Sequence, residues 1–278
     1  MENGAYTLEA RTIIQTISAP GWSSILCSLD PVDTGIIDNS WEAPWYTKKP
    51  LPITPITGNS KPFPCIFEEI KTQNNSLKTH FYYNWDWFFN LANQRIPGSF
   101  IDNDYWCNAS TFTQYLFCDG TIVSKAVDTI KNGDFDVMVL YLCGLDETGH
   151  QFGWGSPEYE AELGIINNYL GDIKSALIQK GIFEETYILI TSDHGGTMGD
   201  KHHGAQRDDN IIVPWIIYGP NVKKNYTLKG NVHNMDSMPN LLYALGMKPN
   251  SLWRGNVFQD AFIKTVILLS NRNINSML

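Results

Sequence analysis

The sequence predicts an α/β fold, a three-layer α/β/α sandwich with a mostly parallel central sheet. Three short apolar runs each lead into a polar turn that contains glycine, and a helix with clear capping residues lies between the first two runs. Bounded runs rich in Val, Ile and Leu suit buried parallel strands better than half-exposed antiparallel strands. Because no internal repeat, low-complexity tract or linker divides the chain, we expect a single domain over residues 1–278.

The three apolar runs are the expected strands, and the first two form a strand-helix-strand unit with the helix between them. That helix begins after Ser156 as N-cap with Pro157 in the first position, and it ends before Gly181. Its apolar residues recur at spacings of three and four, which gives one face for packing: Leu163, Ile166, Leu170, Ile173 and Leu177. The expected strands are Asp136–Leu142 before GLDETGH, Tyr187–Thr191 before SDHGG, and Ile211–Tyr218 before GPN.

Further helices are predicted outside this unit. They cover Cys65–Thr72, Gly120–Asn132 and Asp236–Leu245, the last of which is stopped by Gly246.

The segment of residues 42–118 is expected to be irregular, because it combines many prolines with a dense aromatic cluster. Either it shapes the substrate pocket, or it is an excursion over the sheet whose aromatic side chains simply pack. The residues concerned are Pro44, Pro50, Pro52, Pro55, Pro62, Pro64, Tyr82, Tyr83, Trp85, Trp87, Phe88 and Phe89.

Composition limits the classes of partner. A formal net charge of -9 and a pI near 5.1 argue against a surface that holds duplex nucleic acid through many Lys and Arg contacts. The charge of an anionic substrate must then be met locally, by metal ions or helix ends. No stretch approaches the roughly 18 to 20 apolar residues that span a bilayer, and the start, MENGAYTLEAR, lacks a signal pattern.

The five cysteines show no metal-type spacing, and we expect reduced, partly buried thiols for all of them. A loop closed by Cys107 and Cys118 is the alternative for a secreted protein. Acceptor patterns for N-glycosylation occur at Asn74, Asn108 and Asn225, although such patterns often arise by chance. The cysteines are Cys27, Cys65, Cys107, Cys118 and Cys143.

Two clusters of metal-ligating residue types follow two of the expected strands. Asp146 and His150 come after the first strand, and Asp193 and His194 after the second. Ligands of open α/β sheets gather at the carboxyl ends of strands, so both clusters should face one crevice. Carboxylate with imidazole suits zinc or a similar divalent ion, and two such pairs suggest two ions. One pair alone would more simply be a surface turn; His202-His203-Gly204 further along strengthens the metal interpretation.

A candidate nucleophile lies near the start, in RTIIQTISAPGWSSILCS. A strand-like run ends at Ser18, and Pro20 then begins a helix, so Ser18 sits where backbone N–H groups and the helix dipole favour an anion. Taken alone, Ser18 would more often be a helix cap.

These segments resemble the motifs of the alkaline phosphatase superfamily, in particular its type I phosphodiesterase/nucleotide pyrophosphatase branch. The run TISAPGWSSILCSLDPVDTGIIDNSW is similar to the nucleophile segment of that family, with Ser18 on the nucleophile and Asn39 on the residue that binds a phosphoryl oxygen. It departs from the family pattern at Ser28, where Gly is usual, and at Thr34, where His is usual. The family's D-x-x-G-H, S-D-H-G and late H-G motifs match in order, and MDSMPNLLYALG is similar to a further family helix.

The resemblance implies an alkaline phosphatase-like fold with two divalent metal ions, zinc in particular. One ion would be held by Asp146, His150 and His203, and the other by Asp193 and His194 with the oxygen of Ser18. His202 rivals His203, but the family ligand directly precedes Gly, so His202 is expected to be solvated. His233 has no motif match and is interpreted as a surface or capping histidine. Thr16 is the next candidate nucleophile after Ser18.

The family normally opens with a buried strand that ends in Asp-Gly, and this Asp completes the second metal site. The chain is expected to begin after that strand, since Glu2 and Glu9 lack strand context. On this interpretation residues 1–278 are an N-terminally incomplete catalytic domain, and any signal peptide of a secreted, lysosomal or periplasmic protein was lost with the strand.

The implied function is two-metal hydrolysis of a phosphodiester or nucleotide pyrophosphate through a phosphoryl-serine intermediate. The alternatives are a phosphomonoesterase on the same fold and a non-catalytic remnant. An arylsulfatase would need an Arg that Ser18-Ala-Pro-Gly-Trp lacks, and a phosphomutase would need a large cap. The expected partner is a small phosphoester or nucleotide, with the leaving group undetermined.

Overall fold

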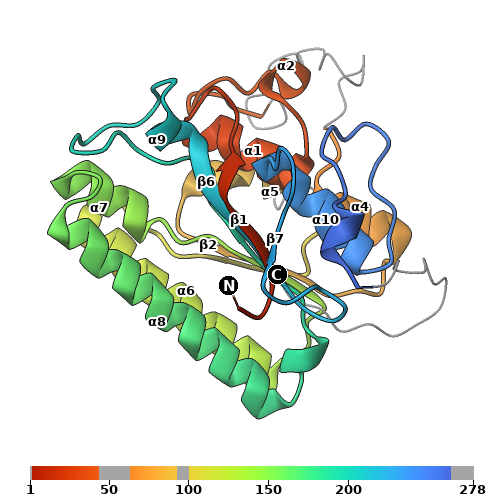
Figure 1. The fold of residues 1–278 in the computed structure, drawn as a ribbon. Coiled ribbons are helices and arrows are strands. Elements are labelled where there is room, and N and C mark those ends of the chain that lie inside the picture. The colour runs from red at the N-terminus through yellow and green to blue at the C-terminus, as the bar shows by residue number, and fades with distance from the viewer. Residues whose placement is uncertain (1, 44–62, 93–99, 264–278) are drawn as a thin grey trace. The chain divides into compact units, whose positions relative to one another are not determined.

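The computed structural model describes residues 2–43, 63–92 and 100–263, and its ribbon is drawn in Figure 1. The chain divides into two compact units. The first unit takes the described residues of Met1–Ser76, Tyr187–Gly195 and His203–Ile274, and the second takes those of Leu77–Thr186 and Gly196–His202. The single domain over residues 1–278 stays a prediction.

The first unit contains a four-stranded mixed sheet in the order β5-β6-β1-β7. Strand β1 pairs antiparallel with β6 and parallel with β7, while β5 pairs antiparallel with β6. The expectation of parallel strands is therefore wrong for β5 and β6. Strand β6 starts beside the end of β5. The strands are β1 (Ala5–Arg11), β5 (Ile188–Thr191), β6 (Ile212–Tyr218) and β7 (Tyr226–Thr227).

Strand β1 ends at Arg11, earlier than the expected strand-like run, which extends to Ser18. The expected run up to Ser18 is not a strand after Arg11, and Glu9, expected to lack strand context, lies in β1 with an exposed side chain. The register shifts between Thr7 and Ala10, so the simple alternation of buried and exposed residues is broken. Because of this bulge, the sequence of β1 lacks the alternating pattern that indicates a strand.

Helices α1 and α10 of the first unit pack on each other (Figure 1). Helix α10, preceded by the short helix η3, lies where a helix ending at Gly246 was predicted. Cys65 is the N-cap of α4 and forms a disulfide with Cys27 at the end of α1. The helices are α1 (Ser18–Cys27), α2 (Pro31–Thr34), α4 (Ile66–Gln73), α9 (Asp208–Ile211), η3 (Asn234–Asp236), α10 (Ser237–Ala244) and η4 (Gln259–Ala261).

The second unit contains a parallel sheet in the order β3-β2-β4. Its elements are β2 (Thr79–Tyr83), η1 (Asp86–Phe88), α5 (Phe89–Ala92), β3 (Asn103–Trp106), α6 (Phe112–Asn132), β4 (Val137–Leu140), α7 (Gly144–Phe152), α8 (Pro157–Lys180) and η2 (Phe183–Glu185). Residues 42–118 are therefore not irregular throughout, since they supply α4 and the central strand β2. The prolines from Pro44 to Pro62 lie outside the described residues.

The aromatic cluster of this segment packs into the core of the second unit. Tyr82, Tyr83 and Phe88 have no exposed surface, and Trp87 is 6% exposed. Trp85 stacks on Trp87 with ring centroids 5.1 Å apart. These contacts favour simple packing over a role in covering substrate.

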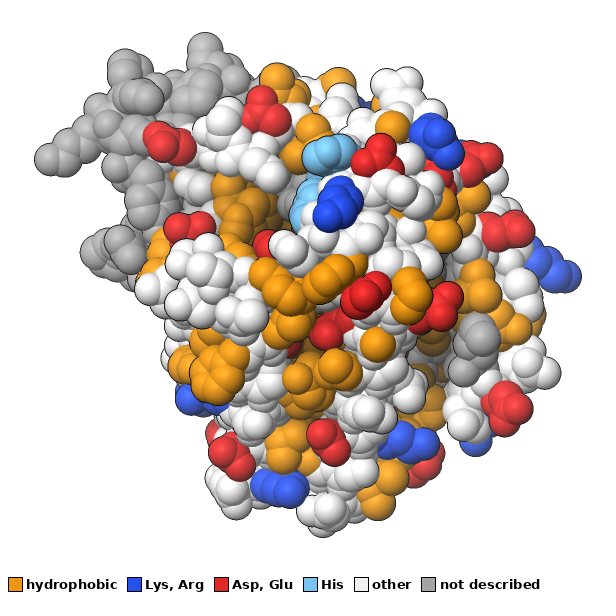
Figure 2. All heavy atoms as spheres, turned by 90° about the vertical axis from the view of Figure 1, so that its left-hand side faces the viewer, with side chains coloured by type: hydrophobic (Ala, Val, Ile, Leu, Met, Phe, Trp, Pro, Cys, Tyr) orange, Lys and Arg blue, Asp and Glu red, His pale blue; other side chains and the backbone are white. Residues whose placement is uncertain are grey.

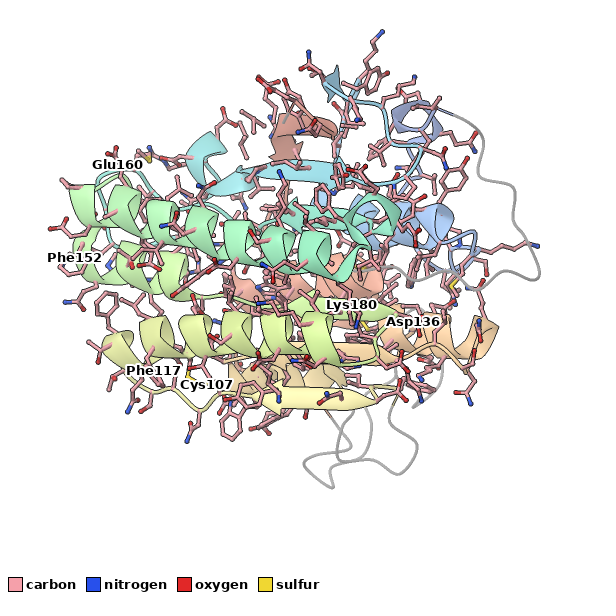
Figure 3. All side chains as sticks on the ribbon, turned by 90° about the horizontal axis from the view of Figure 1, so that it is seen from below. Cys107, Phe117, Asp136, Phe152, Glu160 and Lys180 are labelled. Atoms are coloured by element: carbon pink, nitrogen blue, oxygen red, sulfur yellow. A yellow bond between two sulfur atoms is a disulfide. The ribbon has the colours of Figure 1, made fainter. Side chains whose placement is uncertain are left out.

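Helix α8 is bounded as the sequence predicts. The Ser156 side chain accepts a hydrogen bond from the Tyr159 N–H, and Gly181 ends the helix with φ 81°. Its apolar face is narrower than expected, because Leu163 is 52% exposed. Lys180, labelled in Figure 3 at the end of α8, donates to the carbonyl of Lys131 in the last turn of α6.

The prediction of five reduced thiols is wrong. Cys27 pairs with Cys65 and Cys107 with Cys118, while Cys143 is a buried free thiol. The Cys27–Cys65 disulfide joins residues that are 38 positions apart and that meet only in the folded chain. The Cys107–Cys118 disulfide closes the short loop that is the alternative for a secreted protein. Among the described residues, no helix combines the length and the apolar character that crossing a membrane requires.

Candidate active site

The loop after β5 carries Asp193 and His194, and two side-chain hydroxyls donate hydrogen bonds to its backbone. The Ser192 hydroxyl donates to the His194 carbonyl over 2.8 Å. The Thr12 hydroxyl donates to the Asp193 carbonyl, and the Asn234 side chain in turn donates to Thr12 Oγ1 over 2.7 Å. Thr12 and Asn234 are both buried. The backbone that presents Asp193 and His194 is therefore rigidly placed.

Ser18 is the first residue of α1, and its hydroxyl oxygen lies 3.2 Å from Nε2 of His194. Asn39 lies at the same helix end, because its Oδ1 accepts the Ala19 N–H over 2.8 Å. This contact leaves the Nδ2 donors of Asn39 for a substrate oxygen. Ser18, Asn39 and His194 are thus brought together around the positive end of a helix dipole.

Gly21 permits the close approach of α1 to the metal-type cluster. A Cβ atom on Gly21 would lie 2.9 Å from both Cβ and the carbonyl oxygen of Asp193. Any larger residue would push α1 away from Asp193.

His203 stacks on His194, with ring centroids 3.8 Å apart and planes at 16°. The Nδ1 atom of His194 lies 2.8 Å from the Gly195 carbonyl, and that of His203 lies 2.7 Å from the Thr16 carbonyl. A carbonyl oxygen only accepts, so each Nδ1 carries a hydrogen, and in the neutral ring Nε2 then has the lone pair that can bind a metal ion. Metal-binding histidines are usually oriented in this way. Asp193 completes the cluster with Oδ2 3.3 Å from His194 Nε2.

The other pair lies on α7 in the second unit. Asp146 and His150 are one turn apart, with Oδ2 and Nε2 separated by 3.5 Å. The Nδ1 of His150 lies 2.9 Å from the Lys201 carbonyl, so this imidazole is also held through Nδ1. Burial raises the pKa of the neighbouring Glu147, Asp146 raises it further, and His150 opposes the shift. The sharing of one ion by Asp146, His150 and His203 stays a prediction.

The remaining histidines differ from these three. His202 is exposed, as expected for a solvated neighbour of His203. Both ring nitrogens of His80 are engaged, Nδ1 with the Tyr82 hydroxyl and Nε2 with the Asp134 carbonyl. His233 is the N-cap of η3. Asp193 and His194, with Oδ2 and Nε2 3.3 Å apart, offer the carboxylate oxygen and imidazole nitrogen that a divalent ion such as zinc usually takes as ligands.

The departure of the sequence from the family pattern at Ser28 has a structural explanation. Ser28 ends α1 with φ 50° and ψ 38°, a left-handed conformation that favours glycine. The serine hydroxyl offsets the strain by donating to the Met235 carbonyl and accepting the Gly255 N–H. Thr34 is buried at the end of α2, and its hydroxyl accepts the Ile36 N–H. Neither residue touches the Ser18 cluster in these contacts.

Sequence reasoning missed the residues that orient this site. Thr12 and Asn234 belong to no recognisable motif. Thr16 orients His203 through its backbone carbonyl. The buried hydroxyl of Thr16 donates instead to the Ala205 carbonyl oxygen over 3.2 Å. A backbone acceptor leaves no mark in the sequence, so no signal could have found Thr16 in this role.

The two sheets, one parallel and one mixed, make an α/β fold like that of solved ectonucleotide pyrophosphatase/phosphodiesterase and sulfatase structures. Residues 1–217 match the family model described as type I phosphodiesterase / nucleotide pyrophosphatase. The chain belongs to this family.

Solved structures extend the likeness over nearly the whole chain. Human ectonucleotide pyrophosphatase/phosphodiesterase 5 superposes with a TM-score of 0.68 at 14% identity, over 95% of this chain and 92% of that chain. A putative sulfatase from Bacteroides thetaiotaomicron gives a TM-score of 0.66 at 14% identity, over 94% of this chain and 67% of that one. At these identities the likeness establishes the fold alone.

Curated relatives match shorter stretches. Human ectonucleotide pyrophosphatase/phosphodiesterase family member 7 is 32% identical over 97 residues, 32% of this chain and 21% of the relative. GPI ethanolamine phosphate transferase 1 of Chaetomium globosum is 31% identical over 110 residues, 39% of this chain and 12% of the relative. The matches thus cover about a fifth or less of the length of these relatives.

Proposed function

We propose that the chain is a metal-dependent phosphoric ester hydrolase that cleaves phosphodiester or nucleotide pyrophosphate bonds through a phosphoryl-Ser18 intermediate. The observation that carries the proposal is the 3.2 Å separation between Ser18 Oγ and His194 Nε2, at the start of a helix and beside an oriented His203. The family membership supports the same reaction class.

The protein groups have distinct tasks in this proposal. Ser18 Oγ attacks phosphorus, and the bond from phosphorus to the leaving oxygen breaks as the new bond forms. The first amides of α1 and the Asn39 Nδ2 group bind the transferring oxygens, whose charge grows in the transition state. Water then cleaves the phosphoryl-serine bond and restores the hydroxyl of Ser18.

Two divalent ions, zinc in particular, complete the proposal. Asp193 and His194 with Ser18 would hold one ion, and Asp146, His150 and His203 the other. When bound, the ions would lower the pKa of the Ser18 hydroxyl and offset the negative charge of the phosphoryl group.

The net charge of -9 does not favour a polyanion such as duplex nucleic acid as a partner. On the face drawn in Figure 2, Lys and Arg side chains are scattered among acidic and apolar ones rather than gathered in one patch. The murine ectonucleotide pyrophosphatase/phosphodiesterase 5 has been solved in complex with AMP, a ligand of the proposed kind. Duplex nucleic acid is not an expected partner.

A phosphoryl transferase is the second candidate, because several curated relatives are named GPI ethanolamine phosphate transferases. The same phosphoryl-serine would then pass its group to an alcohol instead of water. Adding methanol or ethanolamine to the reaction separates the two functions, since a transferase forms the new ester in preference to the hydrolysis product.

The decisive experiment measures zinc content by elemental analysis together with turnover of bis(4-nitrophenyl) phosphate. We expect turnover that is lost on chelation and restored by zinc, and a 4-nitrophenyl phosphoryl group on the Ser18 peptide after acid quench, because only one 4-nitrophenolate leaves when Ser18 attacks. A protein that binds no zinc and turns over neither this diester nor 4-nitrophenyl phosphate would instead be a non-catalytic member of the family.

A further inference from the structure

Asp119 of α6 has no exposed surface, and three N–H groups donate to its carboxylate. The Gly144 N–H donates to Oδ2 over 2.7 Å, and the Cys143 N–H to Oδ1 over 3.2 Å. The Asn84 side chain donates to Oδ1 over 2.7 Å. Cys143 and Gly144 are the N-cap and first residue of α7, and the Cys143 side chain makes no capping hydrogen bond. Asp119 therefore caps α7 from another helix, where a carboxylate also complements the helix dipole.

We propose that Asp119 is a positioning residue that fixes the start of α7 and thereby the orientation of Asp146 and His150. This inference rests on the proposed function, because it treats these two side chains as metal ligands. Both lie within the nine residues of α7, and Asp146 is in its first turn. Metal–ligand distances tolerate deviations of only about 0.2 Å, so fraying or rotation at this helix end would weaken the site.

The packing around Gly144 explains why the cap comes from a neighbouring helix. A Cβ atom on Gly144 would lie 2.7 Å from Asp119 Oδ2, 2.9 Å from Glu162 Oε1 and 2.9 Å from Leu116 Cδ2. Helices α6 and α8 thus press on the first residue of α7, and only glycine lets its amide reach the carboxylate. In Figure 1 these three helices lie side by side in the second unit, in agreement with their contacts.

The buried position of Asp119 disfavours the charged form of its carboxyl group. Burial, with a smaller contribution from the buried Glu162, raises the pKa of Asp119 to about 7, while the hydrogen bonds from Gly144, Asn84 and Cys143 oppose this shift. A buried carboxyl whose pKa is shifted by its surroundings is a candidate functional group. The geometric role of the cap supplies such a function.

The test compares Asp119→Asn with Asp128→Asn, an exposed acid on the same helix. Hydrogen exchange of the α7 amides is measured in metal-free protein, and zinc affinity by competition with a chelating dye. The Asp119→Asn substitution replaces one carboxylate oxygen, which accepts a hydrogen bond, with an NH2 group, which donates. This NH2 group then faces another N–H donor. We expect exchange at the start of α7 to accelerate about tenfold and zinc affinity to fall about 10- to 100-fold, with turnover recovered at saturating zinc. Asp128→Asn should change none of these.

Two results would overturn the proposal. Unchanged hydrogen exchange in α7 of Asp119→Asn would mean that Asp119 does not hold the helix. A lower unfolding midpoint of this variant with normal zinc affinity would mean that Asp119 contributes only to packing. Gly144→Ala tests the same contact from the helix side if Asp119→Asn fails to fold. If wild-type protein bound no zinc while Asp119→Asn still loosened α7, the proposed function would be wrong, and the role of Asp119 in placing ligands would fall with it.

Discussion

The Nδ1 atom of His203 lies 2.7 Å from the carbonyl oxygen of Thr16, two residues before Ser18. The segment that leads into α1 therefore also orients an imidazole that is distant in the sequence. This contact favours His203 over its neighbour His202, which is exposed, as a metal ligand.

His203→Ala should weaken zinc binding by at least about tenfold, because it removes an oriented nitrogen donor. His202→Ala is the matched control and should leave zinc affinity unchanged. Competition with a chelating dye measures both. If the two variants exchanged these results, His202 would be the ligand and the H-G motif would have been misaligned by one residue.

Ser18→Ala should lower phosphodiester turnover by at least about a thousandfold and abolish the phosphoryl-enzyme, because the attacking oxygen is gone. Ser18→Thr keeps a hydroxyl at the same helix end and should retain measurable turnover. Intact-mass analysis after acid quench detects the intermediate. Normal turnover of Ser18→Ala, measured beside active wild-type protein, would show that Ser18 is not the nucleophile but only the first residue of α1.

Trp87→Ala should lower the free energy of unfolding by about 3–5 kcal/mol, because it empties a large buried site. Phe117→Ala, at a position that is 73% exposed and labelled in Figure 3, should change it by less than about 0.5 kcal/mol. Denaturant unfolding measures both. A Trp87 variant of normal stability that selectively lost diester turnover, with monoester turnover kept, would restore the substrate-binding interpretation of the aromatic cluster.

Stability should fall as the pH drops below about 6.5, the ordinary pKa of histidine. Burial lowers the pKa of His80, and the Asp134 carbonyl and nearby Asp102, Asp134 and Asp136 only partly oppose this. The unfolded chain then binds more protons between the lowered pKa and 6.5, so acid favours unfolding in that window.

Urea midpoints between pH 5 and 8 measure this dependence. His80→Gln should flatten the slope, whereas His202→Gln, at an exposed position, should keep the wild-type slope. A His80→Gln slope equal to wild type would show that other groups control acid stability.

Local patterns predicted much of the fold because their causes are local. Ser156, Pro157 and Gly181 bound α8 through side-chain capping and a left-handed turn, effects that need only adjacent residues. The runs that became β4, β5 and β6 were likewise recognisable from buried aliphatic residues. Strand β1 was not, because its bulge and the exposed Leu8 and Glu9 break the alternation on which recognition depends.

The sequence by itself determined the family, the order of the motifs, and the residue types able to bind metal and phosphate, since each is written in side chains at short spacing. Only the tertiary structure decided the antiparallel pairing of β5 with β6, the Cys27–Cys65 disulfide, and the contacts of Thr16 and Asp119. These features join residues far apart in the chain, and several use backbone atoms that every residue shares. No sequence pattern distinguishes such atoms, so their partners become defined only when the chain has folded.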